Sequence, residues 1–479
     1  MKFLSTFVLA LLSFCAFSQS ITWTTPITVY STSGSNLHPR ISLNRSGNPI
    51  ILWGKTDSRA YFSRWNGTAF TAPTAVNGSL SVFAQSWAGP EMANFGDTIY
   101  VAMQVTPECV SSAHAYLAHS YDGGATFSAP VQVTNIDTST SRFITVTTNS
   151  SGNPLVAFMK FNSTCGNAHY VVARSTDFGA TFTSDVLASG ASGMVCDCCP
   201  STLLSSGSKA VILFRNNLSN IRDIYAGVSN DGGATFSSTM PVDNNNWAIS
   251  SCPASGPDGF IISDTAYSVF MSGGSGVSIC YLSRTSISTG GLVNNQIAGS
   301  VIGISQQNYP RIANSGLAAT AVWKQNTIAG TALVYAFTDT ISKGFSSVTN
   351  LAIGNSVMNA DVAMAPGEVH VVWEDDNTNS VMYMKGTYTM PSAVQNIASK
   401  EMIEVFPNPA EEYFSISLSN TVKIASSCLI DVIGRHIELK PNYKNDKFTF
   451  SVKGLTKGIY YFNMTDDAGK NYFSKITVQ

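Results

Sequence analysis

Residues 120–130 read SYDGGATFSAP, and close copies follow as STDFGATFTSD at residues 175–185 and SNDGGATFSST at residues 229–239. The three copies start 55 and 54 residues apart. A repeat of this length is typical of an array or a β-propeller, because each unit can bury its apolar face only against its neighbours. We therefore expect similar units that follow one another along the chain.

A short apolar strand that ends in a bulky residue recurs seven times, with spacings of 50, 55, 56, 56, 53 and 50 residues. This spacing suits four short strands with their loops, which is one blade of a propeller. Aromatic residues at 11% and 37 glycines also favour strands over helices. The fold class that we predict is all-β, with a seven-bladed propeller over residues 19–392; six blades are the alternative if one unit is degenerate. The bulky residues are Trp53, Met103, Phe158, Phe214, Phe270, Trp323 and Trp373.

The repeated stretch has the chemistry of a tight turn. Its Ser and Asp side chains can bond to the turn backbone, its Gly can adopt a positive φ, and its closing Phe can pack into the sheet. This pattern resembles the Asp-box (BNR) repeats of sialidase-like propellers. In that family the box joins the third and fourth strands on the face away from the active site, so the resemblance implies a structural role. The residues concerned are Ser120, Asp122, Gly124, Phe127, Ser175, Asp177, Gly179, Phe182, Ser229, Asp231, Gly233 and Phe236.

The N-terminal stretch ITWTTPITVY at residues 21–30 resembles the segment TFSAPVQV that follows the first box. It is therefore predicted to be a displaced fourth strand. The last unit, which runs to Thr389, lacks such a strand. Pairing the two would close the ring and remove the free sheet edges.

The two ends of the chain carry targeting signals. Residues 1–18 have a Lys followed by an apolar run and a small-residue exit, the layout of a secretory signal peptide. After a linker at residues 393–402, residues 403–479 show the pattern of about seven short strands, which predicts a small β-sandwich. This module resembles the C-terminal sorting domain of type IX secretion through Pro407, Asn408, Pro409, Asp431, Gly434, Leu455, Gly458 and Tyr460. The resemblance implies a partner in that secretion machinery and a secreted or outer-surface location; an ordinary accessory sandwich is the alternative.

The composition narrows the classes of partner. The net charge is −2 and only 12% of residues are charged, so no basic surface for nucleic acid is expected. No later apolar run approaches the roughly 20 residues that span a bilayer. We therefore expect no nucleic-acid partner and no transmembrane segment.

Six cysteines are predicted to share one rim of the ring, where the first strands begin. Cys109 and Cys165 occupy equivalent loops of adjacent units and could bridge. If the stretch CDCCP is extended, Cys196 and Cys198 point one way and Cys199 the other. Cys252, in the next unit, is a plausible partner for one of these three. In an export compartment we favour disulfides.

The alternative use of these thiols is a metal site. Cys196, Cys198 and Cys252, with His114 and His169 on the same rim, offer the soft sulfur and imidazole ligands that suit copper or zinc. No cofactor is favoured over the disulfide interpretation.

The resemblance to sialidases also implies a catalytic set: three arginines that grip a carboxylate, a Tyr nucleophile polarised by a Glu, and an Asp acid/base. Tyrosine nucleophiles are an exception among glycosidases. Proline precedes the arginine in HPRI and YPRI, whereas the family has an R-I-P order, and no Tyr/Glu pair can be assigned. The candidates at the rim are Arg40, Arg142, Arg311, Tyr309, Asp361 and Asp197, and Glu91 is a further rim carboxylate.

Two main hypotheses follow. The favoured one is a secreted propeller that binds a glycan or a protein at a disulfide-braced mouth, because a fold does not fix a function. The other is an active exo-glycosidase of the exo-α-sialidase type.

Overall fold

The computed structural model describes residues 20–108, 110, 114–133, 140–162, 164, 166–190, 193–297, 304–327, 330–354, 357–389, 400–418, 423–431, 436–444, 447–467 and 471–479. The chain divides into two compact units, Met1–Met390 and Pro391–Gln479, which are described separately.

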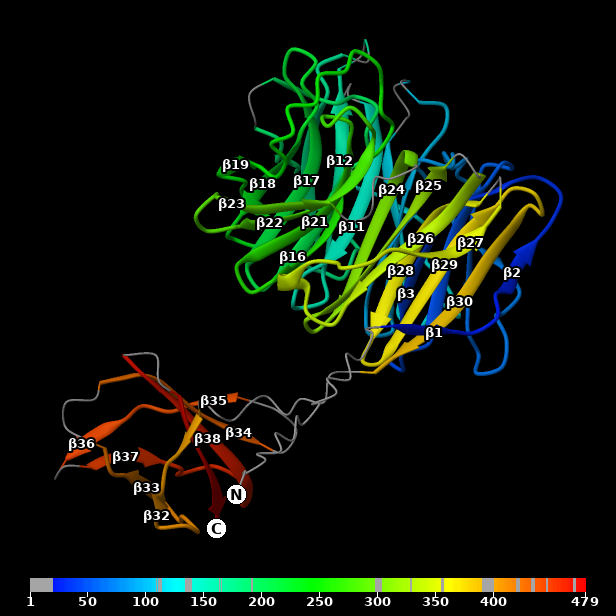
Figure 1. The fold of residues 1–479 in the computed structure, drawn as a ribbon. Coiled ribbons are helices and arrows are strands. Elements are labelled where there is room, and N and C mark those ends of the chain that lie inside the picture. The colour runs from blue at the N-terminus through cyan, green and yellow to red at the C-terminus, as the bar shows by residue number, and fades with distance from the viewer. Residues whose placement is uncertain are drawn as a thin grey trace, which may run out of the picture. The chain divides into compact units, whose positions relative to one another are not determined.

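The described residues of the first unit form seven antiparallel sheets, which follow one another along the chain (Figure 1). Six of them are built from strands that are consecutive in the chain. The first three sheets contain β3 (Asn36–Leu43), β4 (Pro49–Lys55), β5 (Arg59–Arg64) and β6 (Thr74–Ala75); β7 (Glu91–Phe95), β8 (Thr98–Gln104), β9 (Ala115–Ser120) and β10 (Val131–Gln132); and β11 (Thr140–Thr148), β12 (Pro154–Phe161), β13 (His169–Arg174) and β14 (Val186–Leu187). The next three contain β15 (Met194–Val195), β16 (Thr202–Ser206), β17 (Lys209–Asn217), β18 (Ile224–Ser229) and β19 (Ser238–Pro241); β20 (Asp258–Ile262), β21 (Thr265–Ser272), β22 (Ile279–Ser286) and β23 (Leu292–Ile297); and β24 (Ile304–Ser315), β25 (Ala318–Thr327), β26 (Gly330–Thr338) and β27 (Thr349–Ile353).

The seventh sheet joins the two ends of the unit. It contains β28 (Val357–Ala365), β29 (Glu368–Asp375) and β30 (Ser380–Tyr388), together with the N-terminal strands β1 (Ile21–Trp23) and β2 (Ile27–Ser31). Ile21 lies opposite Tyr388, and Ile27 lies opposite Tyr383. The predicted pairing of the N-terminal strand with the last repeat is therefore confirmed.

The sheets are arranged in a cycle. Their first strands contact one another in the order β3, β7, β11, β16, β20, β24, β28 and back to β3. The seven bulky residues singled out in the sequence lie on the strands that pair directly with these first strands, and each is 2% exposed or less; the strands are β4, β8, β12, β17, β21, β25 and β29. Strands account for almost all regular structure among the described residues, so the all-β prediction is confirmed.

Four first strands contain the same irregularity. The pairing register shifts next to His38, Phe143, Tyr309 and Asn359, and each of these residues has a positive φ between 50° and 56°. Left-handed backbone is uncommon for residues other than glycine. A bulge of this kind bends the strand and re-aims its side chains, so equivalent positions of several sheets are turned at the same end.

The repeated turns connect the third strand of a sheet to its fourth. In the first copy the Ser120 hydroxyl accepts a hydrogen bond from the Gly124 N–H (2.9 Å), and Asp122 Oδ1 accepts one from the Thr126 N–H (2.9 Å). The ring of Phe127 packs against Phe62 of the preceding sheet at 5.0 Å. The other two copies repeat the Ser and Asp bonds at 2.8 to 2.9 Å.

The second unit has two sheets. One contains β31 (Lys400–Met402), β39 (Asn471–Val478), β38 (Gly458–Asp466), β34 (Ile424–Asp431) and β35 (His436–Glu438); the other contains β32 (Val405–Phe406), β33 (Tyr413–Ile416), β37 (Lys447–Ser451) and β36 (Asn442–Lys444). The Phe462 ring of the first sheet lies 5.0 Å from Phe414 and 4.9 Å from Phe450 of the second. One aromatic core thus holds both sheets, with nine described strands where about seven were predicted.

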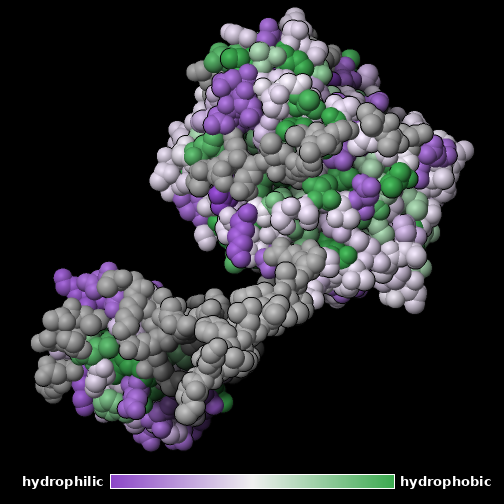
Figure 2. Space-filling view, in the orientation of Figure 1, coloured by the Kyte–Doolittle hydropathy of each residue, from purple (hydrophilic) through white to green (hydrophobic). Residues whose placement is uncertain are grey.

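The surface of the first unit is mixed. Hydrophobic and hydrophilic residues are interspersed over the face seen in Figure 2. Among the described residues, no helix has the length and apolar character to cross a membrane.

Candidate functional site

The bulged first strands bring residues from distant parts of the chain to one small cavity. It has a volume of about 40 Å³ and is lined by His38, Arg40, Trp87, Glu91, Tyr309 and Arg311, among others. We call it the mouth cavity. Two of the predicted arginines and the predicted tyrosine therefore lie together.

Both arginines of the mouth cavity are already paired with carboxylates of the protein. Arg40 donates from Nε to Glu91 Oε2 (2.8 Å) and from Nη2 to Glu91 Oε1 (2.9 Å), which is a bidentate pair. Arg311 Nε donates to Asp361 Oδ1 (3.0 Å), and its Nη2 lies 3.8 Å from Glu91 Oε2. Burial alone would raise the pKa of Glu91, but Arg40, His38 and Arg311 hold it well below its usual range.

Asp361, one of the candidate rim residues, is buried and bonds to residues of two other sheets. Its Oδ2 accepts the Ile41 N–H of the neighbouring first strand (3.0 Å), while Oδ1 accepts from Arg311. Asp258, two sheets before Asp361 in the cycle, makes the equivalent contact, since its Oδ2 accepts the Ile312 N–H of the next first strand (2.9 Å). These carboxylates thus satisfy backbone N–H groups of β3 and β24, which lie at the ends of their sheets.

The charge of Glu374, a residue that the sequence did not single out, acts on Tyr309. Burial raises the pKa of Glu374 to about 7, although its carboxylate accepts bonds from the His38 N–H (3.0 Å) and the Ser86 hydroxyl (2.7 Å). Burial, followed by the charge of Glu374, raises the pKa of Tyr309. Glu374 is part of the motif VHVVWED, but a strand pattern cannot show that this residue, directly after the buried Trp373, is buried as well.

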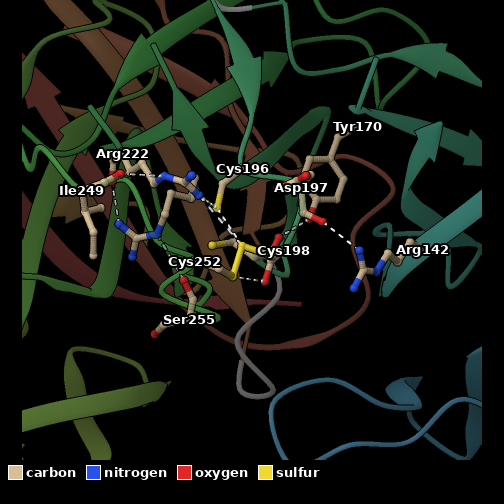
Figure 3. The surroundings of a disulfide bond; sticks show 11 residues. Arg142, Tyr170, Cys196, Asp197, Cys198, Arg222, Ile249, Cys252 and Ser255 are labelled. Atoms are coloured by element: carbon tan, nitrogen blue, oxygen red, sulfur yellow. Dashed lines mark hydrogen bonds between the residues drawn. A yellow bond between two sulfur atoms is a disulfide. The ribbon is translucent and has the colours of Figure 1, made fainter. Parts of the chain in front are cut away.

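Arg142 and Asp197 lie at a different place on the same rim. Arg142 Nε donates to Glu108 Oε1 (2.8 Å), and its Nη1 donates to the backbone carbonyl of Asp197 (3.1 Å) (Figure 3). The Arg142 guanidinium also covers the Phe143 ring at 4.5 Å. Arg142 does not line the mouth cavity, and the Asp197 side chain is exposed. The three arginines therefore do not converge on one pocket.

The cysteine cluster lies beside this arginine. Cys198 and Cys252 form a disulfide between successive repeats (Figure 3). The Sγ atoms of Cys196 and Cys198 are 3.5 Å apart, and those of Cys196, Cys198 and Cys199 all lie within 4.8 Å of one another. Cys109 and Cys165, the other predicted disulfide pair, lie outside the described residues.

The stretch CDCCP is not extended, so the side-chain directions given for an extended segment do not apply. Val195 lies opposite Asn216 and Thr202 lies opposite Leu213, so six residues face only two on β17 and must leave the sheet. They form a turn in which the Cys199 N–H donates to the Cys196 carbonyl (3.2 Å). The turn brings the Cys199 sulfur to the side of the other two.

The predicted metal ligands do not gather. Among the described residues, the group that could hold a metal at this place contains the three cysteines of the turn, without His114 or His169. Cys198 is bonded to Cys252, and His169 Nδ1 lies 2.8 Å from the Asn167 carbonyl. The Arg222 guanidinium lies 3.1 Å from Cys196 Sγ. A cation at this distance favours a thiolate and opposes a second cation.

A larger cavity lies where the ring closes. It has a volume of about 510 Å³ and is lined by Ile27, Trp65, Glu368, His370, Tyr383 and Lys385, among others. Its wall includes the turn after β3, whereas His38 near the start of β3 lines the mouth cavity, so the two lie at opposite ends of this strand. Sequence analysis missed it because ring closure alone brings residues 24–65 to residues 368–385.

Comparisons with known proteins agree with this architecture. Residues 16–266 match the BNR repeat-like domain, just over half of the chain, and residues 404–479 match the secretion system C-terminal sorting domain. No curated protein matches the chain.

Solved structures with a similar fold include an ulvan lyase from a new polysaccharide lyase family, bound to -[GlcA(1-4)Rha3S]-, with 10% identity, a TM-score of 0.51, and coverage of 76% of this chain and 96% of that one. A sialidase of Trypanosoma rangeli with the inhibitor DANA has 12% identity, a TM-score of 0.43, and coverage of 93% and 85%. A Dyadobacter fermentans protein of unknown function has 10% identity, a TM-score of 0.47, and coverage of 77% and 99%. At these identities the likeness concerns the fold alone.

Proposed function

This chain belongs to the BNR repeat-like family of sialidase-like propellers, and from that premise we propose that it is an exported glycan-binding protein whose mouth cavity takes a neutral sugar. The sorting domain indicates export by type IX secretion to the cell surface or the extracellular space, and implies interaction with that machinery. The cyclic contacts of the first strands support seven blades. The aromatic core shared by two sheets supports a β-sandwich at the C-terminus.

The observation that carries the proposal is the pairing of both mouth arginines with Glu91. A carboxylate ligand such as sialic acid needs a guanidinium whose donors are available. Arg40 has its bidentate face on Glu91, and Arg311 is shared by Glu91, Asp258 and Asp361. An added negative charge would meet these carboxylates. A hydroxyl group both donates and accepts, so it can bond to such a compensated network without changing its charge.

The walls of the mouth cavity also suit a sugar. Trp87 and Tyr309 are half-buried and line it, so each offers an apolar ring with a polar tip. Ligand sites combine such aromatic walls with a few placed polar groups. The cavity is too small to enclose a sugar ring, so we expect one ring to lie over Trp87 with a hydroxyl directed at Arg40 and Glu91.

The test is calorimetric titration of the full mature protein with neutral and with sialylated oligosaccharides. We expect a neutral glycan to bind and Trp87→Ala to weaken it at least tenfold, because the ring loses its apolar platform. Tyr121→Ala is the matched control: it removes an aromatic that is 55% exposed in a repeated turn, and binding should not change. Binding of sialylated ligands alone, binding of no glycan, or full affinity in Trp87→Ala would refute the proposal.

One observation favours a second function, an exo-glycosidase of the sialidase type. Tyr309 lines the mouth cavity under the influence of Glu374, whose pKa of about 7 suits a general base at neutral pH. Turnover of a fluorogenic sialoside panel tests it. Hydrolysis that is lost in both Tyr309→Phe and Arg311→Ala would establish the enzyme and replace the binding proposal. Absence of hydrolysis by the wild-type protein would exclude this second function.

A further inference from the structure

The disulfide at the rim has two unlike ends. Cys252, which precedes β20, is exposed, whereas Cys198 lies in the turn before β16 against the buried Cys196 and Cys199. The bond thus joins an exposed residue to a half-buried one whose sulfur contacts a protein thiol. A disulfide that only braces two sheets needs no such neighbour.

The nearest thiol is held in contact with the bond. Cys196 Sγ lies 3.5 Å from Cys198 Sγ, about the van der Waals contact distance. Cys196 is fixed from both sides, because its N–H donates to the Arg215 carbonyl (2.8 Å) and its carbonyl accepts from Cys199 (3.2 Å). The turn therefore keeps a potential nucleophile beside the sulfur that it would attack (Figure 3).

The surroundings shift the pKa values of the two free thiols of the turn, Cys196 and Cys199, in opposite directions. A hydrogen bond from Cys199, the Cys198 N–H and the charges of Arg215 and Arg222 together lower the pKa of Cys196 to about 6, against the opposing effect of burial. Burial raises the pKa of Cys199 well above its usual range, and the thiolate of Cys196 raises it further. These opposite shifts favour a Cys196 thiolate with Cys199 as its hydrogen-bond donor. Arg222 is itself oriented by its Nε bond to the Ile249 carbonyl (3.1 Å).

We propose that Cys196, Cys198 and Cys252 form a thiol–disulfide exchange site that presents Cys252 to low-molecular-weight disulfides. The Cys196 thiolate attacks Cys198 Sγ, so that a Cys196–Cys198 bond forms while the Cys198–Cys252 bond breaks. Cys252 leaves with the electron pair as a thiolate. This step consumes no oxidant or reductant, because one thiolate and one disulfide are present before and after it.

The second step uses the exposed position of Cys252. Its thiolate attacks one sulfur of an external disulfide, forms a mixed disulfide and releases the other half as a thiolate. The net result is covalent attachment of a thiol compound at the rim. In contrast, two inert thiols beside a fixed disulfide would leave Cys252 permanently blocked.

Trapping of Cys252 tests the first step. The oxidised, folded protein is incubated at pH 8 with excess N-ethylmaleimide, and its peptides are mapped by mass spectrometry. Because the label is irreversible, it accumulates at the rate of exchange even where the exchanged form is rare. We expect label on Cys252 together with an internal Cys196–Cys198 bond. Cys196→Ser should slow this labelling at least tenfold, whereas the matched control Cys280→Ser, which removes a buried thiol of β22 outside the turn, should leave its rate unchanged.

A second variant tests the same step in case the cysteine variants do not fold. Arg222→Gln removes the cation beside Cys196 and leaves all four sulfurs, so it should slow the labelling while near-ultraviolet circular dichroism stays unchanged. Incubation with cystine should add one half-cystine to Cys252 in the wild type. An intact Cys198–Cys252 bond in the labelled wild type, label on Cys196 in its place, or equal rates in wild type and Cys196→Ser would overturn the proposal.

Discussion

Glu374 is a carboxylic acid that the fold buries among hydrogen-bond donors rather than beside a cation. It is fully buried, and Asn359 Nδ2 adds a third donor at 3.2 Å. Its pKa rises from 4.5 to about 7 because burial disfavours the charged form. The folded protein therefore binds a proton that the unfolded chain has released. Its contribution to stability is complete below pH 4.5 and is lost as the pH rises through 7.

We accordingly expect Glu374→Gln to raise the free energy of unfolding at pH 8, where the wild type must bury a charge. Two and a half pH units correspond to at most about 3 kcal/mol. The gain should shrink toward pH 5, where Glu374 is protonated in the fold. Urea unfolding at pH 5, 6, 7 and 8 measures the difference. Asp197→Asn removes an exposed carboxylate and should give a constant difference; a constant difference for Glu374→Gln as well would show that burial does not control this group.

The contacts of single residues at the mouth could be predicted only in part. The motifs HPRI and YPRI lie at equivalent strand positions, and both Arg40 and Arg311 line the mouth cavity. Their partners Glu91 and Asp361 come from other sheets, about 50 residues away in each case. A repeat reveals which positions are equivalent, but the choice between a free and a paired guanidinium depends on side-chain directions that the bulges set.

In the first repeated turn, two neighbouring glycines allow the cost of backbone strain to be measured separately from the cost of overpacking. Gly123 and Gly124 both have a positive φ, 70° and 81°. A Cβ on Gly124 would lie 2.2 Å from the Phe62 ring, whereas one on Gly123 would meet nothing closer than 3.7 Å. Gly123→Ala should cost only the left-handed penalty of about 1 kcal/mol. Gly124→Ala adds overpacking and should cost a further 1–3 kcal/mol, roughly. Thermal unfolding of both variants measures this difference, and equal melting temperatures would contradict the role of the turn in packing adjacent sheets.

Strands were easier to predict than turns for a physical reason. Trp53, Phe158 and Trp323 are buried by a periodic pattern that sequence displays directly. The CDCCP turn depends instead on a count across the sheet, because β15 and β16 both pair with β17. That pairing is fixed by residues 209–217, outside the motif itself, so alternation within CDCCP could not reveal the turn.

For the first unit as a whole, stability depends on the joint between its first and last strands. β1 and β2 cover the outer edge of β30, and the sheet has no other strand there among the described residues. An uncovered edge presents unpaired N–H and C=O groups that recruit other chains. Gly386 on β30 permits the close approach, since a Cβ there would lie 2.3 Å from Ile21 and 2.8 Å from Trp23.

Gly386→Val therefore tests closure without shortening the chain. The added side chain cannot coexist with Ile21 and Trp23, so β1 should leave the sheet. We expect a lower melting temperature and concentration-dependent association in light scattering, because the edge of β30 becomes available to a second molecule. Gly190→Val is the control, as a Cβ at Gly190 meets nothing within 4 Å. Removal of residues 20–31 should reproduce the effect, and a peptide of that sequence added in trans should reverse it. A monomeric Gly386→Val protein with wild-type stability would mean that the sheets hold together without the N-terminal strands, and that ring closure does not stabilise the unit.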